Sequence, residues 1–104
     1  DLVNFGNHEF DLKDKYLQKR LNESNFQWMS SNVLHKVDGK SIPFTVQKEK
    51  DTVAIPTSFT FQIKNKKGKE VKIGFIGTTL PSNPVPYVDY GDIYKDAKTA
   101  YTSI

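Results

Sequence analysis

The chain has 104 residues, of which 37% are hydrophobic and 26% are charged, an ordinary globular composition for one domain with a modest core. Its net charge of +3, from 15 Lys and Arg against 12 Asp and Glu, is too small to indicate a nucleic-acid partner by itself. The sequence contains no cysteine, which excludes a disulfide framework and a thiolate site, and no run is long or apolar enough to span a membrane.

The first third of the sequence predicts a βαβ unit. The apolar run at 2–5 indicates a short buried strand, and residues 12–24 carry apolar side chains at helical spacing. We expect Asp11 to cap this helix, with Asp14 in a capping-box position. Residues 26–33 indicate the next strand. A strand, a helix and a second strand in this order favour parallel pairing with a right-handed crossover.

The middle of the chain predicts extended structure. A polar turn at 35–41 precedes two short extended pieces at 42–46 and 52–55. Residues 57–64 and 70–77 then alternate between apolar and polar side chains on either side of a turn. This pattern predicts an antiparallel hairpin whose second strand runs into a buried sheet.

The last third predicts a long irregular loop at 78–91, with three prolines, followed by a helix at 93–104. The length of the loop suggests a functional or covering role. Tyr87 and Tyr90 in this loop either line a substrate cleft or cover the sheet. We therefore expect an α/β fold with a βαβ unit, then an antiparallel hairpin and a C-terminal helix. Five aromatic residues are expected in its core, namely Phe26, Trp28, Phe59, Phe61 and Phe75.

The residue types that carry chemistry concentrate in the turn between the first strand and the helix. This turn reads Gly6-Asn7-His8-Glu9-Phe10-Asp11. It lies where an α/β fold presents polar side chains, at the carboxyl end of its sheet, and the glycine lets the backbone approach a ligand. The alternative for each side chain is an ordinary polar or surface residue of a turn.

The motif resembles the signature of the calcineurin-like metallophosphoesterase superfamily. Its Phe-Asp ending is most similar to the branch that contains 5′-nucleotidases and 2′,3′-cyclic phosphodiesterases. Two further blocks resemble that branch in order and spacing, Ser-Asn-Val at 31–33 and Gly-Lys-Glu-Val-Lys-Ile-Gly-Phe-Ile-Gly-Thr-Thr at 68–79. The resemblance implies a partial metallophosphoesterase sandwich. It also implies that residues 1–104 are the middle portion of one catalytic domain, and we expect both ends to be truncated.

The resemblance implies hydrolysis of nucleotide-like phosphate esters with two divalent metal ions, which would be Mn, Zn, Mg or Fe. It makes Asn7 a metal ligand through its side-chain oxygen. It places His8 against the phosphate, where the imidazole stabilises charge and assists the leaving oxygen. Asp11 would pair with His8 and hold its ring, whereas Glu9 is expected to be a structural carboxylate.

The sequence also departs from the family. The family's Asp-x-His and Gly-Asp ligands belong upstream of the motif, and its remaining histidine ligands belong downstream. Gly91-Asp92 resembles the Gly-Asp block in letters but follows the motif, and His35, expected on a solvated loop, fits no ligand position. We therefore expect the isolated chain to be metal-free, inactive or very weakly active, and prone to self-association. The resemblance favours an exported parent protein.

Two other functions stay open. A non-catalytic binding or structural module on the same scaffold would lack the remaining ligands in its native gene. The lysines of the predicted hairpin could instead bind a polyanion, although a charged, protected hairpin is the more usual meaning of such a pattern. These lysines are Lys64, Lys66, Lys67, Lys69 and Lys72.

Overall fold

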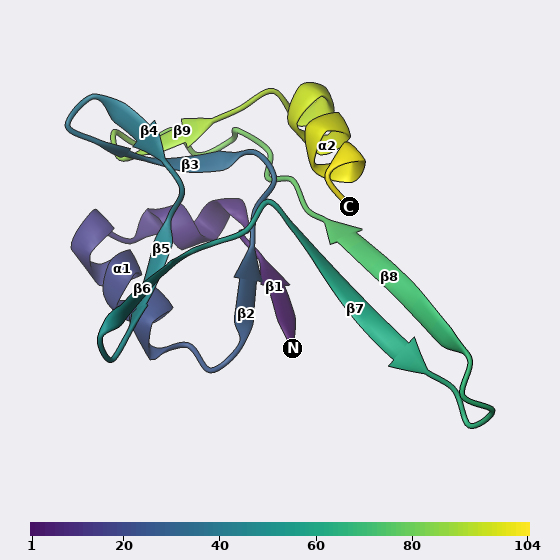
Figure 1. Ribbon diagram of the computed structural model, residues 1–104. Coiled ribbons are helices and arrows are strands. Elements are labelled where there is room, and N and C mark those ends of the chain that lie inside the picture. Colours follow the sequence, from purple (N-terminus) through teal and green to yellow (C-terminus); the bar gives the residue numbers. More distant parts are fainter.

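The computed structural model describes all 104 residues, which form a mixed α/β fold of two α-helices, one 3-10 helix and nine short strands (Figure 1). The strands make four small sheets, β1-β2, β4-β3-β9, β5-β6 and β7-β8. The elements in chain order are β1 (Leu2–Asn4), η1 (Asn7–Asp11), α1 (Asp14–Glu23), β2 (Gln27–Met29), β3 (Val33–Val37), β4 (Lys40–Ile42), β5 (Thr45–Lys48), β6 (Asp51–Ala54), β7 (Ser58–Lys64), β8 (Glu70–Ile76), β9 (Val88–Tyr90) and α2 (Ile93–Thr102).

The βαβ unit is present as predicted. Strands β1 and β2 pair in parallel, with Val3 opposite Trp28, and α1 connects them. Leu17 and Leu21 lie four residues apart on one face of α1, and both are buried. The apolar face of the helix therefore anchors it to the core.

The start of α1 differs from the prediction. Residues 7–11 form η1, and α1 begins only at Asp14, with Lys13 in the N-cap position and no side-chain cap hydrogen bond. The predicted cap at Asp11 is wrong because its carboxylate bonds the side chains of His8 and Asn83 instead.

The predicted strand at 26–33 is divided between two sheets. Strand β2 ends at Met29, and the backbone N–H groups of the next two residues no longer bond to β1. Ser30 N–H donates to the carbonyl of Pro56, and Ser31 N–H donates to that of Gly77. The chain then enters the sheet β4-β3-β9. Strand β9 lies within the segment expected to be wholly irregular, where it pairs with β3 in the antiparallel sense.

The turn predicted at 35–41 is shorter than expected, because residues 35–37 belong to β3 and residues 40–41 to β4, and only a tight hairpin turn separates them. Its two central residues, Asp38 and Gly39, have φ values of 50° and 78°. Positive φ at both positions is what a type I′ turn requires, and Asp-Gly is a preferred pair for it.

The hydrophobic core lies between the βαβ unit, β3 and the segment that leads into β5. Phe5 is its centre, since the centroid of its ring lies 4.9 Å from that of Trp28, 5.3 Å from that of Phe44 and 5.5 Å from that of Phe10. The buried members of the cluster are Phe5, Phe10, Leu17, Leu21, Trp28, Val33, Phe44, Ile55 and Val88.

The predicted hairpin is confirmed, but its burial is not. Strands β7 and β8 pair over seven residues each, with Phe61 opposite Ile73, and extend away from the body as an arm (Figure 1). Every residue of β8 is exposed, so the expectation that it runs into a buried sheet is wrong. Phe26, Phe61 and Phe75 are likewise exposed rather than in the core. Alternation identifies a pleated face but does not say what covers it.

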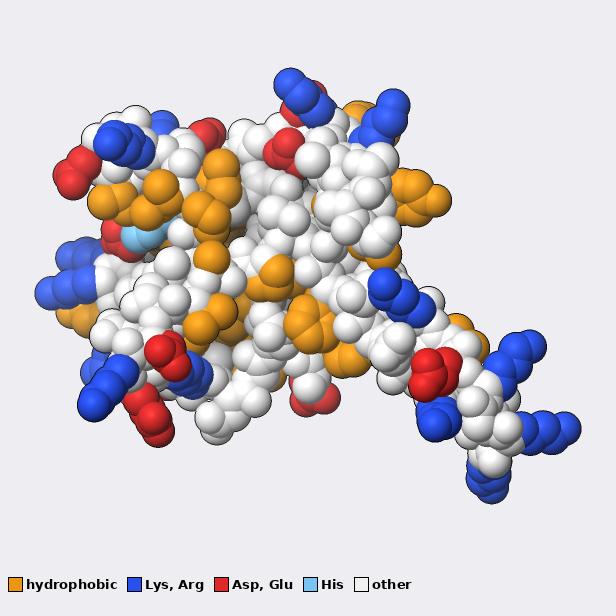
Figure 2. Space-filling model, in the orientation of Figure 1, with side chains coloured by type: hydrophobic (Ala, Val, Ile, Leu, Met, Phe, Trp, Pro, Cys, Tyr) orange, Lys and Arg blue, Asp and Glu red, His pale blue; other side chains and the backbone are white.

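The tip of this arm is strongly basic. Figure 2 shows Lys side chains gathered at its end, where Lys64, Lys66, Lys67 and Lys69 lie on or beside the turn. Like charges at a strand end hinder edge-to-edge pairing at that point.

Neither helix is long and apolar enough to cross a membrane.

Leu21→Ala tests the assigned core. Leu21 is 0% exposed, so truncation leaves a cavity, and we expect the free energy of unfolding to fall by about 2–5 kcal/mol. Ile63→Ala on the arm, where the side chain is 52% exposed, should change it by about 0.5 kcal/mol or less. Urea unfolding followed by the fluorescence of the single, buried Trp28 measures both variants. Equal losses would contradict this position of the core.

Candidate active-site turn

The turn that carries the motif follows β1 directly. Residues 7–11 are η1, and Phe10 anchors it because its side chain is buried among the aromatic rings of the core. Gly6 has φ −91° and ψ 167°, an extended conformation that any residue adopts. A Cβ at Gly6 would lie 3.1 Å from Oε2 of Glu9, so the glycine leaves room for that carboxylate. Glu9 thus packs against the turn itself.

His8 and Asp11 lie together on the outside of the turn. Nδ1 of His8 is 2.9 Å from Oδ2 of Asp11. The two side chains are 83% and 60% exposed. An ionised carboxylate only accepts, so Nδ1 carries the proton and Nε2 remains free toward solvent. An exposed pair of this kind contributes only ~0–1 kcal/mol, so it does little to hold itself in place.

Two residues of the loop at 78–91 bind the motif. Nδ2 of Asn83 donates to the backbone carbonyl of Asn7 and to Oδ1 of Asp11, each at 2.8 Å. Nδ2 of Asn7 donates to Oγ of Ser82 at 2.9 Å. Segments more than 70 residues apart in sequence therefore meet at the candidate site.

Tyr87 and Tyr90 tie the same loop to the turn. Both rings pack edge to face against the ring of Phe10, with centroid distances of 6.4 Å for Tyr87 and 5.8 Å for Tyr90. The Tyr87 hydroxyl donates to the backbone carbonyl of Leu12, and the Tyr90 hydroxyl donates to that of Asn83 at 2.8 Å. Of the two roles expected for these tyrosines, the geometry shows that they cover the core and hold the loop.

A buried asparagine closes the base of the loop. Nδ2 of Asn32 donates to the carbonyl of Thr79 at 2.9 Å, and Oδ1 accepts from Thr79 N–H at 2.8 Å. Gly91 N–H donates to the carbonyl of Asn32 at 2.6 Å. Thr79 in turn donates from its hydroxyl to the carbonyl of Phe5 at 2.6 Å, just before the motif. Both ends of the loop are therefore fixed beside the end of β1.

The residues present do not complete a metal site. The chain contains no cluster of three or more His, Asp or Glu side chains arranged to hold an ion. Asn7 offers one amide oxygen, since its nitrogen is the atom that donates to Ser82. The nearby Asp11 carboxylate already has a partner on each oxygen, His8 and Asn83.

Two other polar residues that the sequence singled out have structural roles. Asp92 is the N-cap of α2, where its Oδ1 accepts from Lys95 N–H at 2.8 Å. His35 is not on a solvated loop as expected. It lies in β3, its Nε2 is 2.9 Å from a carboxylate oxygen of Asp14, and its ring stacks on Phe44 at 4.5 Å. This pair fixes the start of α1 against β3.

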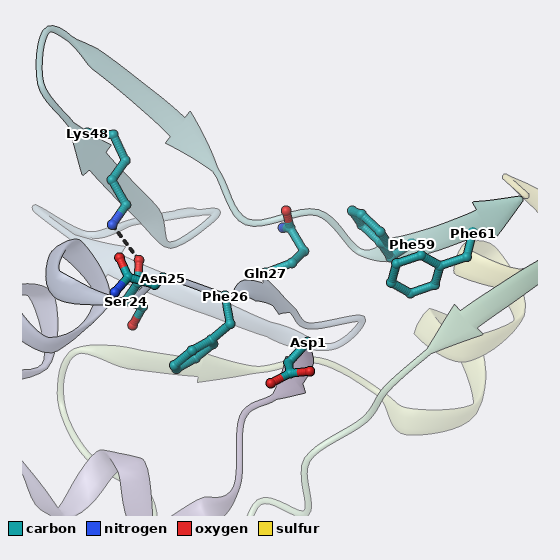
Figure 3. Close-up of a pocket in the computed structure, with 8 residues that line it drawn as sticks. All are labelled: Asp1, Ser24, Asn25, Phe26, Gln27, Lys48, Phe59 and Phe61. Carbon is teal, nitrogen blue, oxygen red and sulfur yellow. Dashed lines mark hydrogen bonds between the residues drawn. The ribbon is translucent and has the colours of Figure 1, made fainter.

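The largest pocket lies elsewhere. It has a volume of about 490 Å³ and opens beside the start of β2, with Phe26, Phe59 and Phe61 among its lining residues (Figure 3). Lys48 also lines it, but its ammonium is bound to the backbone carbonyls of Asn22 and Ser24. None of the three pockets is lined by a residue of the motif, so chemistry rather than pocket size identifies the candidate site.

The chain resembles a solved structure in fold. It matches the crystal structure of the calcineurin-like phosphoesterase YfkN from Bacillus subtilis with a TM-score of 0.64 and 21% identity. The match covers 99% of this chain and 30% of that chain, so the present chain spans about a third of the length of the protein it matches. No family model and no curated protein matches the sequence. At this identity the likeness shows a shared fold.

The sequence did not point to Asn83 or Ser82 as partners of the motif. The available signal was the length of the proline-rich loop, which predicted a functional or covering segment without naming its contacts. Asn32 belongs to the Ser-Asn-Val block at 31–33 that resembles the family. Its side-chain amide makes two hydrogen bonds with the backbone of Thr79 and so sets the path of the loop.

Tyr87→Phe tests the hold of the loop on the turn. Burial, with a smaller contribution from Asp14, raises the pKa of Tyr87 from its usual 10 to about 12. The unfolded chain thus releases this proton first, and the stability due to the neutral phenol is present below pH 10 and lost as the pH rises toward 12. We expect the variant to be about 1 kcal/mol less stable at neutral pH, through the lost hydrogen bond.

Urea unfolding of both proteins between pH 8 and pH 12 measures this effect. The stability advantage of the wild type should shrink from pH 10 upward, because only the wild type carries the shifted group. A constant difference across this range would contradict the burial and bonding of the Tyr87 hydroxyl.

Proposed function

We propose that the chain is part of a phosphoesterase, and that residues 7–11 form one corner of its active site. The observation that carries this proposal is the His8–Asp11 pair, presented in the turn after β1 of a fold that matches a calcineurin-like phosphoesterase. The proposed substrates are phosphate esters of nucleotides or similar small molecules, as in the 5′-nucleotidase and 2′,3′-cyclic phosphodiesterase branch that the motif resembles.

The proposed role of His8 follows from its geometry. Its Nδ1–H is directed to Asp11, so the exposed Nε2 is the atom that can meet a phosphate ester. A protonated ring would donate to a phosphate oxygen, offset developing charge and assist the leaving oxygen. Asp11 touches no substrate in this proposal and instead fixes the ring orientation.

The proposed metal ligand is Asn7. An amide oxygen suits Mn, Mg, Fe or Zn in a site of mixed oxygen and nitrogen ligands. Because the present residues supply only this corner, we propose that the ligands for two divalent ions come mainly from segments outside residues 1–104. As the motif resemblance implies, we propose that the chain forms the middle of a larger catalytic domain; the match covers 30% of the phosphoesterase chain.

Hydrolysis assays on two forms of the protein test the proposal. The 104-residue chain should be inactive or very weakly active. The chain extended by the segments that its gene encodes on either side should hydrolyse p-nitrophenyl phosphate, 5′-AMP or 2′,3′-cyclic AMP with Mn²⁺, Mg²⁺, Zn²⁺ or Fe²⁺. In the extended protein we expect His8→Ala to lower kcat by about 100-fold and leave residual activity, because His8 is one contributor among several.

The second histidine provides the control. His35→Asn removes an imidazole that binds Asp14 and Phe44, so it should lower stability and leave kcat nearly unchanged. An extended protein that is inactive with every metal would contradict the proposal and favour a non-catalytic module. Clear metal-dependent activity of the 104-residue chain, abolished by His8→Ala, would contradict an incomplete site.

We also propose that the arm promotes self-association with a second copy of the chain. Strands β7 and β8 pair only with each other, so both outer edges offer free N–H and C=O groups. Apolar side chains along the arm are exposed, among them Phe61 at 38% and Val71 at 52%. An antiparallel arrangement of two arms would separate their basic tips and bury these side chains together.

Sedimentation velocity over a range of concentrations tests this proposal. The wild type should show concentration-dependent association, and Phe61→Lys with Ile73→Lys, which changes an opposed pair on the arm, should remove it. Ile42→Lys with Val53→Lys adds the same charge to exposed apolar positions off the arm and should leave association in place. A monomeric wild type at all concentrations would overturn the proposal.

A further inference from the structure

The side-chain amide of Asn83 is placed between two acceptors of the motif. Its nitrogen lies 2.8 Å from the carbonyl oxygen of Asn7 and 2.8 Å from Oδ1 of Asp11. A carbonyl and an ionised carboxylate can only accept, so the nitrogen of the amide must face them. Each of its two N–H groups then has one partner, and the orientation of the amide is fixed.

This contact divides the Asp11 carboxylate between two partners. Oδ1 accepts from Asn83, and Oδ2 accepts from Nδ1 of His8 at 2.9 Å. Because His8 and Asp11 are both exposed, their pairing alone would have to overcome the rotamer freedom of two mobile side chains. A carboxylate that Asn83 already holds leaves only the imidazole to be ordered.

Asn83 is itself held by the core. The Tyr90 hydroxyl donates to its backbone carbonyl at 2.8 Å, and the Tyr90 ring packs edge to face on Phe10. Pro84 follows directly and restricts Asn83 to extended backbone conformations. A continuous series of contacts thus leads from the buried Phe10 through Tyr90 and Asn83 to Asp11.

We propose that Asn83 is a positioning residue for the candidate catalytic pair. It fixes the carboxylate of Asp11, and through it the Nδ1–H tautomer and the direction of the His8 ring. This catalytic meaning rests on the phosphoesterase function proposed above, whereas the positioning itself is a property of the chain. Asn83 touches neither the imidazole nor a substrate in this proposal.

Nitrogen-15 NMR of the two histidine rings tests the positioning independently of activity. At alkaline pH, where imidazoles are neutral, the ring nitrogen shifts report the tautomer. We expect His8 in the wild type to favour Nδ1–H, and Asn83→Ala to move it toward the Nε2–H form with rotational averaging. His35, which binds Asp14 in a separate pair, should be unchanged and shows that the fold is intact.

Asn65→Ala is the matched control. It removes an asparagine whose Oδ1 also makes two hydrogen bonds, to the N–H groups of Lys67 and Lys69 in the turn of the arm. It should leave the His8 signals unchanged. Unchanged His8 signals in a folded Asn83→Ala protein would overturn the proposal.

A second measurement applies if Asn83→Ala does not fold. The two side-chain amide protons of Asn83 give separate signals, and Asp11→Ala should move the proton that faces Asp11 while leaving the one that faces Asn7. Two unmoved signals would overturn the proposal.

Activity measurements on the extended protein test the catalytic part of the proposal. Asn83→Ala should lower kcat by about tenfold or more with little change in KM, and it should cause no further loss when Asp11 is already alanine. If the two substitutions lowered kcat independently, so that their effects multiplied, the claim that Asn83 acts through Asp11 would be overturned. An inactive wild type would contradict the phosphoesterase proposal alone, because the NMR result stands without it.

Discussion

The reciprocal hydrogen bonds between Asn32 and Thr79 are the constraint on which the candidate site depends. Asn32 is 2% exposed, and its amide both donates to and accepts from the backbone of Thr79, while its own carbonyl receives Gly91 N–H. In a buried setting these bonds are strong, and losing one would leave a costly unpaired group. They fix both ends of the loop at 78–91 and so decide that it returns over the end of β1.

That return path gives the motif its support. The motif is short, the side chains of His8 and Asp11 are exposed, and only Phe10 anchors it from within. The loop contributes the remaining contacts through Asn83, Tyr87 and Tyr90, all of which reach backbone or carboxylate oxygens of the turn or of the loop beside it. A pair of side chains that is weak alone is thereby placed in one arrangement, the condition that the proposed proton transfer to a phosphate ester requires.

The sequence predicted the parts of this fold whose signal is local. Spacing along α1 and alternation along β7 and β8 depend on neighbouring residues, and both elements are found. The start of α1 was wrong because Asp11 has a partner, Asn83, that is 72 residues away. The prediction that the arm is buried was wrong because alternation identifies the apolar face of a strand but not whether another element packs on that face. The prediction of a solvated loop for His35 was wrong because its partner, Asp14, lies on another element.

At the site, the motif identified the candidate residues, whereas the geometry that holds them came from long-range contacts. The central claim is that the loop holds residues 7–11 in a single conformation before any substrate binds. Backbone ¹⁵N relaxation of the free protein tests it most directly. We expect order parameters of about 0.85 for residues 7–11, as in rigid backbone, with cross-peaks from the Asn83 side-chain amide to Asp11. Order parameters below about 0.6 at 7–11, beside a rigid β1 and β2, would contradict it.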